Sequence, residues 1–177
     1  MKKVLVIGTS GSGKSTLAKQ ISEILDVQFF PSDNFYWEAG WKITSYDKVL
    51  EQVKSVTSRK EWVLDGNFET ERELVWKQSD CIIWLDYSLP VILWQVITRN
   101  VKWLITRQII WSENRMTFQR LISGVRHTIK SYSKKKKNYP SWLAELSEIK
   151  VYRFSHKRET ENWLQGLQRS IEQGNLF

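Results

Sequence analysis

The 177-residue sequence contains a single cysteine and has no apolar run long enough to cross a membrane. Because Cys81 has no partner, no disulfide can form within the chain, which fits a reducing compartment. The apolar tract Val91–Ile97 is far shorter than the ~18 residues that a membrane-spanning helix needs. The apolar start, Val4–Ile7, is interrupted by glycines and Lys14 too early to form a secretory signal. These absences predict a soluble, cytoplasmic protein without a membrane partner.

Acidic residues are fewer than basic ones, at 19 against 27, which gives a net charge of +8. This excess predicts acidic partners such as nucleotides, phosphorylated metabolites or nucleic acid, and charge alone does not choose among them. Hydrophobic residues make up 41% and charged residues 26%, a balance typical of a globular chain rather than a disordered one. No linker marks a second domain, so we expect one domain over residues 1–177.

Apolar runs that end at turn-forming residues predict five strands alternating with helices. The expected strands are 4–7, 27–30, 62–64, 81–85 and 149–154, and the expected helices are 14–25, 46–57, 69–77, 89–110, 115–133 and 159–171. This alternation favours a parallel sheet with helices on both faces, the three-layer α/β/α class. The two helices between the fourth and fifth strands have no strand between them. We therefore expect a basic, helical lid insertion over about residues 99–137.

The segment Gly8–Ser15 fits the phosphate-binding pattern G-x-x-x-x-G-K-[ST] at every fixed position. Its glycines let successive backbone N–H groups point at phosphate oxygens, and the helix that follows adds its positive end. Lys14 is expected to reach the β- and γ-phosphates of ATP or GTP, and the Ser15 hydroxyl to bind Mg²⁺. The full set of expected nucleotide-binding residues is Gly8, Thr9, Ser10, Gly11, Ser12, Gly13, Lys14, Ser15 and Thr16. A glycine-rich turn without a ligand is disfavoured by the strand before it and the helix after it.

Three acidic residues follow predicted strands at the edge where open parallel sheets bind ligands. Asp65 has the position of a Walker B acid that holds a Mg²⁺-bound water, and its alternative is a helix N-cap. Asp33 is a candidate to accept a proton from a substrate hydroxyl or to orient the acceptor. The alternative for Asp33 is a turn-forming role beside Asn34. Asp86 is expected to cap the helix that begins near Pro90.

Three further segments are more distinctive than the phosphate loop: Ser32–Trp41, Trp62–Asn67 and Leu85–Pro90. Together they resemble the bacterial family known as DNA topology modulation proteins, small P-loop proteins similar to adenylate kinase. The resemblance is close over residues 1 to about 110 and looser to about 140. It implies an adenylate-kinase-like core with strand order 2-3-1-4-5 and an arginine-rich lid that closes on ATP.

The sequence departs from this family at two positions. Ala39 stands where the family commonly has proline, and Val75 stands where relatives usually carry an arginine. Arg72, one turn earlier, is the candidate replacement for a contact with an acceptor phosphate.

Three arginines lie where adenylate-kinase-like proteins place their lid arginines: Arg99, Arg107 and Arg115. Phosphoryl transfer needs cations at the γ-phosphate, and we expect at least two of these three to face phosphate. The alternative is a solvated helix face.

Aromatic and lysine side chains have two interpretations each. Tyr36, Trp37 and Trp41 either line an acceptor pocket or pack their loop over the sheet. The lysine run 134–137 is expected to be a solvated helix end rather than a DNA contact.

The sequence therefore predicts an ATP-dependent kinase that transfers the γ-phosphoryl group to a nucleotide, nucleoside or other small acceptor. Its expected catalytic residues are Lys14, Asp33, Arg99, Arg107 and Arg115. One alternative is a nucleotide-controlled nucleic-acid-binding protein, favoured by the charge but lacking a recognised DNA-binding motif. A slow NTPase without an acceptor is another. The sequence does not identify the phosphoryl acceptor or the oligomeric state.

Overall fold

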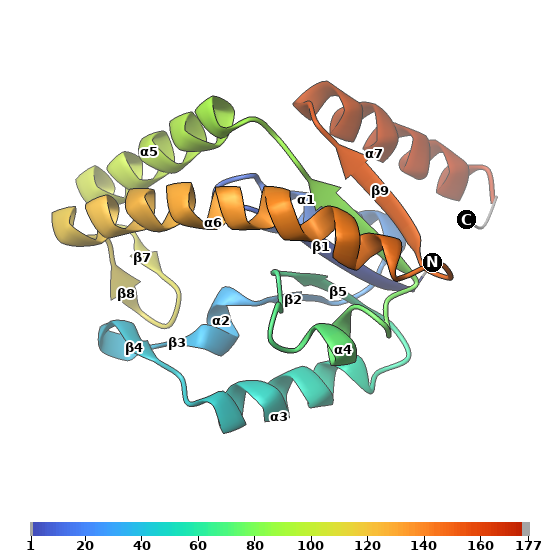
Figure 1. Ribbon diagram of the computed structural model, residues 1–177, viewed down its shortest axis with the longest axis horizontal. Coiled ribbons are helices and arrows are strands. Elements are labelled where there is room, and N and C mark those ends of the chain that lie inside the picture. Colours follow the sequence, from blue (N-terminus) through green and yellow to red (C-terminus); the bar gives the residue numbers. More distant parts are fainter. Residues whose placement is uncertain (1, 175–177) are drawn as a thin grey trace.

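The computed structural model describes residues 2–174 and has a five-stranded parallel sheet at its centre (Figure 1). The strands are β1 (Lys3–Gly8), β2 (Phe29–Pro31), β5 (Trp62–Asp65), β6 (Cys81–Leu85) and β9 (Lys150–Phe154). Their spatial order is β2-β5-β1-β6-β9, which is 2-3-1-4-5 when the strands of this sheet are counted along the chain. The expected three-layer α/β/α class is confirmed.

The central strands are apolar along their whole length because helices cover both faces of the sheet. Val4 to Ile7 of β1 are fully buried. In the register of the sheet, Val6 lies opposite Asp65 of β5 and Gly8 lies opposite Leu85 of β6. The carboxyl ends of three strands therefore meet at one edge, which places the phosphate loop beside Asp65.

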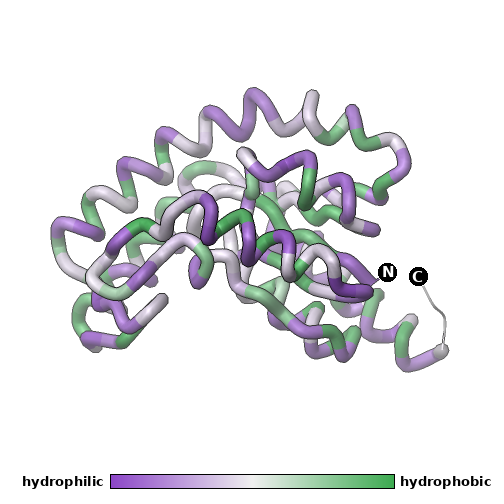
Figure 2. The backbone as a smooth tube through the Cα atoms, turned by 90° about the horizontal axis from the view of Figure 1, so that it is seen from below, coloured by the Kyte–Doolittle hydropathy of each residue, from purple (hydrophilic) through white to green (hydrophobic). Residues whose placement is uncertain are grey.

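Two apolar clusters sandwich the sheet. On one face, α1 (Lys14–Leu25) and α7 (Lys157–Glu172) pack against the strands. On the other face lie α3 (Tyr46–Thr57), α4 (Arg72–Val75) and the carboxyl-terminal part of α6 (Phe118–Ala144). Purple and green segments alternate along the helices in Figure 2, as expected for helices that bury one apolar face.

Helices α5 (Leu89–Thr106) and α6 lie side by side over the edge of the sheet (Figure 1). The expected helix over 89–110 ends at Thr106 because Arg107 takes a left-handed conformation, with φ of 50°. A short hairpin of β7 (Ile109–Ile110) and β8 (Asn114–Arg115) then connects the two helices. In the part of the chain that the structure describes, no helix is long and apolar enough to span a membrane.

A second short hairpin, which the sequence did not predict, follows β2. The chain passes through α2 (Asp33–Tyr36) and β3 (Trp37–Glu38). A 3₁₀ turn, η1 (Ala39–Trp41), then leads to β4 (Lys42–Ile43), which pairs antiparallel with β3. This β3–β4 hairpin lies close to the β7–β8 hairpin in Figure 1.

The prediction that the lysine run 134–137 is a solvated helix end is wrong about the helix end and about Lys135. Helix α6 continues to Ala144, because Tyr139 and Leu143 extend its apolar face into the core. Lys135 is carried inward with it, and its Nζ atom lies 3.2 Å from Glu69 Oε1, whereas Lys134 and Lys137 are exposed.

The prediction that Asp86 caps α5 is also wrong, since the N-cap residue is Ser88. The Asp86 side chain is 3% exposed and pairs with two cations from different elements. Its Oδ1 atom lies 2.8 Å from Lys136 Nζ, and its Oδ2 atom lies 2.6 Å from Arg153 Nη2. This carboxylate therefore joins α6 to β9 beneath the sheet edge.

We expect Asp86→Asn to destabilise the fold, because it removes the negative charge that two cations share. Losing hydrogen bonds to charged groups costs about 1.5–3 kcal/mol, which lowers Tm by roughly 3–12 °C in a chain of this size. Thermal unfolding measures the change. Glu145→Gln is the matched control, since Glu145 forms an exposed pair with Arg72 at 3.7 Å and should shift Tm by about 2 °C or less. Equal shifts in the two variants would contradict the anchoring role of Asp86.

Candidate functional site

The phosphate loop, Gly8–Ser15, joins β1 to α1 and passes close under α5. At Gly11 the backbone has φ of +84°, and an added Cβ atom would lie 2.1 Å from Val96 Cγ2. Only glycine fits this position. Helix α1 begins at Lys14 without a side-chain cap, so its first N–H groups are available to an anion.

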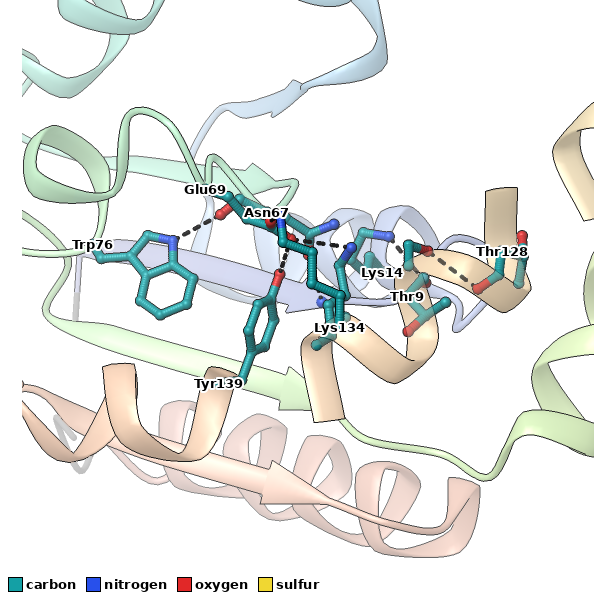
Figure 3. A network of polar contacts seen from close by, with 11 residues as sticks. Thr9, Lys14, Asn67, Glu69, Trp76, Thr128, Lys134 and Tyr139 are labelled. Atoms are coloured by element: carbon teal, nitrogen blue, oxygen red, sulfur yellow. Dashed lines mark hydrogen bonds and ion pairs between the residues drawn. The ribbon is translucent and has the colours of Figure 1, made fainter. Parts of the chain in front are cut away.

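The loop is held in shape by neighbouring residues (Figure 3). The Gly8 N–H donates to Asn67 Oδ1 at 3.0 Å, and Trp76 Nε1 donates to the Asn67 carbonyl at 2.8 Å. Lys14 Nζ donates to the Thr9 carbonyl at 3.2 Å. The Ser12 hydroxyl is buried and has no hydrogen-bond partner among residues 2–174. A phosphate oxygen would satisfy it, so the loop fits a phosphate group.

Asp65 lies at the base of α1, and both of its carboxylate oxygens accept hydrogen bonds. The Ser15 hydroxyl donates to Oδ2, and the Ser32 N–H donates to Oδ1 at 2.8 Å. The alternative interpretation of Asp65 as a helix N-cap is wrong, because α4 starts only at Arg72 and its N-cap residue is Glu71.

The Ser15 and Asp65 oxygens are hard donors of the kind that Mg²⁺ prefers. Among the described residues, no group of three or more His, Cys, Asp or Glu side chains could hold a metal ion by itself. Mg²⁺ at this place would therefore take its other ligands from phosphate and water, as it usually does at nucleotide sites.

Four charged groups from different elements interact at this edge. Burial lowers the pKa of Lys14 to about 8, although the negative charges of Asp65 and Asp33 oppose the shift. Burial and the nearby charge of Asp65 raise the pKa of Asp33 to about 6, with Lys14 and Arg99 opposing. Burial also lowers the pKa of Arg99, against the attraction of Asp33. The structure thus brings Lys14, Asp33, Asp65 and Arg99 together.

The other predicted arginines lie apart from this group of charges. Arg107 is the exposed residue that ends α5, and Arg115 is exposed on β8. Within the described chain, neither guanidinium has a hydrogen bond or an ion pair. Arg72 lies over the Trp142 ring at 4.6 Å and has Glu145 as an ion-pair partner. Thr16 is exposed on the first turn of α1.

The predicted aromatic residues pack against protein neighbours. Trp37 and Trp41 meet edge to face with ring centroids 5.3 Å apart, and Trp41 meets Trp111 in the same way at 6.0 Å. Tyr36 donates a hydrogen bond to Glu71 at 3.3 Å, and burial together with the Glu71 charge raises its pKa. Tyr36 packs against the core on the sheet, whereas Trp37 and Trp41 pack on each other and on Trp111 at the β7–β8 hairpin. Their role in an acceptor pocket stays a prediction.

Sequence reasoning missed two residues that shape the site. Asn67 braces Gly8, and its place directly after the Asp65-Gly66 turn was the available signal, because asparagine side chains commonly hydrogen-bond to nearby backbone. Lys135 is an electrostatic neighbour of Lys14. Nothing in a run of four lysines distinguishes the one that points inward.

No protein-family model matches this sequence. A shikimate kinase from Sulfurihydrogenibium sp. (strain YO3AOP1) is 31% identical over an alignment of 109 residues, and the match covers 52% of this chain and 65% of that protein. Among solved structures, a shikimate kinase from Acinetobacter baumannii in complex with shikimate has a TM-score of 0.60 at 15% identity, covering 100% of this chain and 96% of that one. A gluconokinase from Sinorhizobium meliloti 1021 has a TM-score of 0.54 at 14% identity, covering 99% and 98%.

The chain thus covers slightly less than two thirds of the curated relative's length. The solved structures are too distant in sequence to show more than the fold, but they match this chain from end to end. The fold is that of the small P-loop kinases.

We expect Lys14→Ala to weaken MgATP binding by at least about 30-fold, because the variant loses a charge-assisted contact of about 2 kcal/mol. Its Tm should be unchanged or higher, since the substitution removes an ammonium group that is costly to bury. Titration calorimetry and thermal unfolding measure the two effects. Lys19→Ala, on the exposed side of α1 opposite Glu23, is the control and should bind like the wild type. Unchanged affinity in a folded Lys14→Ala variant would exclude this loop as the nucleotide site.

Proposed function

We propose that this protein is an ATP-dependent kinase that transfers the γ-phosphoryl group to a hydroxyl of a small molecule. The observation that carries the proposal is the position of Asp33, whose carboxylate interacts with Lys14 of the phosphate loop across the sheet edge. A base beside the phosphate loop is the arrangement that phosphoryl transfer to a hydroxyl needs. The fold shared with proteins named shikimate kinase and gluconokinase supports the same activity.

The phosphate loop is the proposed nucleotide site. Residues Gly8–Thr16 would hold the phosphates of ATP, with GTP as an alternative for the same loop, and Lys14 would contact the β- and γ-phosphates. Ser15 would coordinate Mg²⁺ directly, and Asp65 would hold it through a water molecule. When bound, Mg²⁺ neutralises charge on the phosphate oxygens. The unpartnered Ser12 hydroxyl supports phosphate binding at this loop.

Asp33 is the proposed general base. Its side chain has no hydrogen bond or ion pair among the described residues, so both oxygens are free to accept a proton. With a pKa of about 6, the carboxyl group is mostly ionised at neutral pH and is still a stronger base than an ordinary aspartate. Its place at the start of α2 fixes it beside the P-loop.

Arg99 is the proposed anion-binding residue of the acceptor side. It is half-buried near Asp33, and no carboxylate lies within ion-pair distance of it in the described part of the chain. A half-buried guanidinium without an ion-pair partner is stabilised by an anionic ligand. Here that ligand would be either the transferred phosphoryl group or an acid group of the acceptor. Where that ligand is an acid group of the acceptor, the proposed acceptor class is a small hydroxylated molecule that also carries an acidic group.

Residues 99–137 are the proposed lid of a single-domain enzyme, in which Arg107 and Arg115 gain phosphate contacts only when the lid closes. Membership of the DNA topology modulation family is the finer assignment that we propose, from the three segments that resemble it. Nucleic-acid binding is not favoured, because Lys135 and Lys136 are already paired with Glu69 and Asp86. A cytoplasmic location stays a prediction.

The activity can be tested by measuring ATP and GTP consumption with Mg²⁺ against a panel of shikimate, gluconate, nucleosides and nucleoside monophosphates. At least one acceptor should raise turnover about ten-fold or more above the acceptor-free rate. Asp65→Asn should lower Mg²⁺-dependent turnover far more than Mg²⁺-independent nucleotide binding, because the carboxylate orders the metal rather than the phosphates. Binding of MgATP with no stimulation by any acceptor would favour a slow NTPase instead.

The pH dependence of kcat/KM should identify Asp33. The base works only when ionised, so kcat/KM should fall as the pH drops through about 6, the pKa of Asp33 in the free enzyme. Asp33→Asn should lose about 10²–10⁴-fold in kcat/KM and lose this acid limb. Asp47→Asn, an exposed position on α3, is the control and should keep both the rate and the limb. An acid limb that persists in Asp33→Asn would assign the base to another group.

A further inference from the structure

The β3–β4 and β7–β8 hairpins are about 75 residues apart in sequence, and hydrogen bonds join them directly. Two side chains of the β7–β8 hairpin bind backbone of the β3–β4 hairpin, and one indole binds in the reverse direction. The bonds are Ser112 Oγ to the Trp37 carbonyl at 2.5 Å, Asn114 Nδ2 to the Glu38 carbonyl at 3.0 Å, the Trp41 N–H to Asn114 Oδ1 at 2.7 Å, and Trp41 Nε1 to the Arg115 carbonyl at 3.0 Å.

Asn114 is the centre of this contact. The residue is 3% exposed, and both ends of its amide are used. A second bond from Nδ2, to the Trp111 carbonyl at 2.8 Å, closes the turn of its own hairpin. One side chain therefore fixes the shape of the β7–β8 turn and binds the neighbouring hairpin. No aliphatic residue of similar size could do either.

The backbone at this contact is strained. Ser112 and Glu113 form the turn of the β7–β8 hairpin with φ of 51° and 64°, and Trp41 opposite them has φ of 60°. Turns of this kind favour Asn-Gly, because side chains other than glycine crowd the backbone at positive φ. Such conformations persist only where the surroundings fix them, and they cluster at functional sites. Here the hydrogen bonds between the two hairpins hold these residues at positive φ.

A series of tryptophan rings leads from this contact to the candidate acceptor site. Trp41 packs on Trp111 at 6.0 Å, and Trp111 packs on Trp103 at 5.5 Å. The Arg99 guanidinium lies over the Trp103 ring, 4.5 Å from its centre. Arg99 in turn interacts with Asp33. The Arg99 guanidinium is therefore linked to the two hairpins through Trp103 of α5, which packs on Trp111.

We propose that Asn114 is a positioning residue for phosphoryl transfer. The hairpin latch, formed by Ser112 and Asn114 with their partners on the β3–β4 hairpin, makes the two hairpins one body. Through Trp111 and Trp103 this body sets the place of Arg99. The inference rests on the proposed function. It implies that the lid (residues 99–137) and the β3–β4 hairpin open and close together rather than independently.

Hydrogen–deuterium exchange on the whole protein tests the latch without any need for activity. In Asn114→Ala, peptides covering 37–43, 109–116 and 99–106 should all exchange about ten-fold faster or more, while β1 and β6 peptides stay protected. Glu113→Gly is the matched control. It relieves the strain in the same turn and keeps every bond of the latch, so its exchange should match the wild type or be slower.

Faster exchange confined to 109–116, or in none of the three segments, would overturn the single-body proposal. Unchanged exchange at 99–106 with the hairpins open would overturn the link to Arg99. If Asn114→Ala also loses protection in β1 and β6, Ser112→Ala replaces it, because this variant removes only the bond to the Trp37 carbonyl.

The positioning role is then read from MgATP hydrolysis without an added acceptor. Asn114→Ala should lower kcat about ten-fold while KM for MgATP changes less than about two-fold, since the phosphate loop is untouched. A lower Tm with unchanged kcat would show a structural role only and would overturn positioning. If the wild type turns over no MgATP either alone or with any acceptor of the panel, the proposed function fails while the exchange result still decides the latch.

Discussion

The carboxylate of Asp65 is the interaction on which the candidate site depends. It ends β5, the strand between β2 and β1, accepts a bond from Ser15 at the start of α1, and accepts another from the Ser32 backbone before α2. One buried side chain thus ties the phosphate loop to the segment that carries Asp33. Because the parallel strands end at the same edge, the sheet brings these segments within reach, and Asp65 fixes their spacing. Burial perturbs the pKa values of Lys14 and Asp33, and the charge of Asp65 raises that of Asp33 further. The opposite charges gathered at this edge limit both shifts.

The sheet and the phosphate loop could be predicted because local sequence determines them. Val4 to Ile7 can be only a strand covered on both faces, and the Gly8–Ser15 pattern leaves a single backbone path. The edge position of Asp33 and Asp65 followed from the topology alone, although their chemical roles stay proposals. Trp37 and Trp41 were open to two interpretations, because an aromatic residue in a loop packs on whatever is nearest. That neighbour, Trp111, is 70 residues away.

The errors share a physical cause. Asp86 looked like a cap because it precedes Pro90, and the lysine run looked solvated because lysines usually are. Both expectations treated each segment by itself, whereas Asp86 and Lys136 satisfy each other across 50 residues. The predicted helix over 69–77 is only one turn, Arg72–Val75, and it follows Phe68, which adopts a left-handed conformation with φ of 45°. Long-range pairing and positive φ at ordinary residues leave no trace in the local pattern.

Helix α6 has a consequence for how this protein can vary. Its 27 residues make a rod about 40 Å long. Near one end, Tyr139 packs in the core, and both Tyr139 and Lys135 contact Glu69. The β7–β8 hairpin is attached at the other end. One residue inserted between these ends would turn one attachment by about 100° relative to the other. The length of the helix therefore sets both the distance of the β7–β8 hairpin from the core and its rotation about the helix axis. Sequence changes at its exposed positions should be tolerated, whereas changes in its length should not.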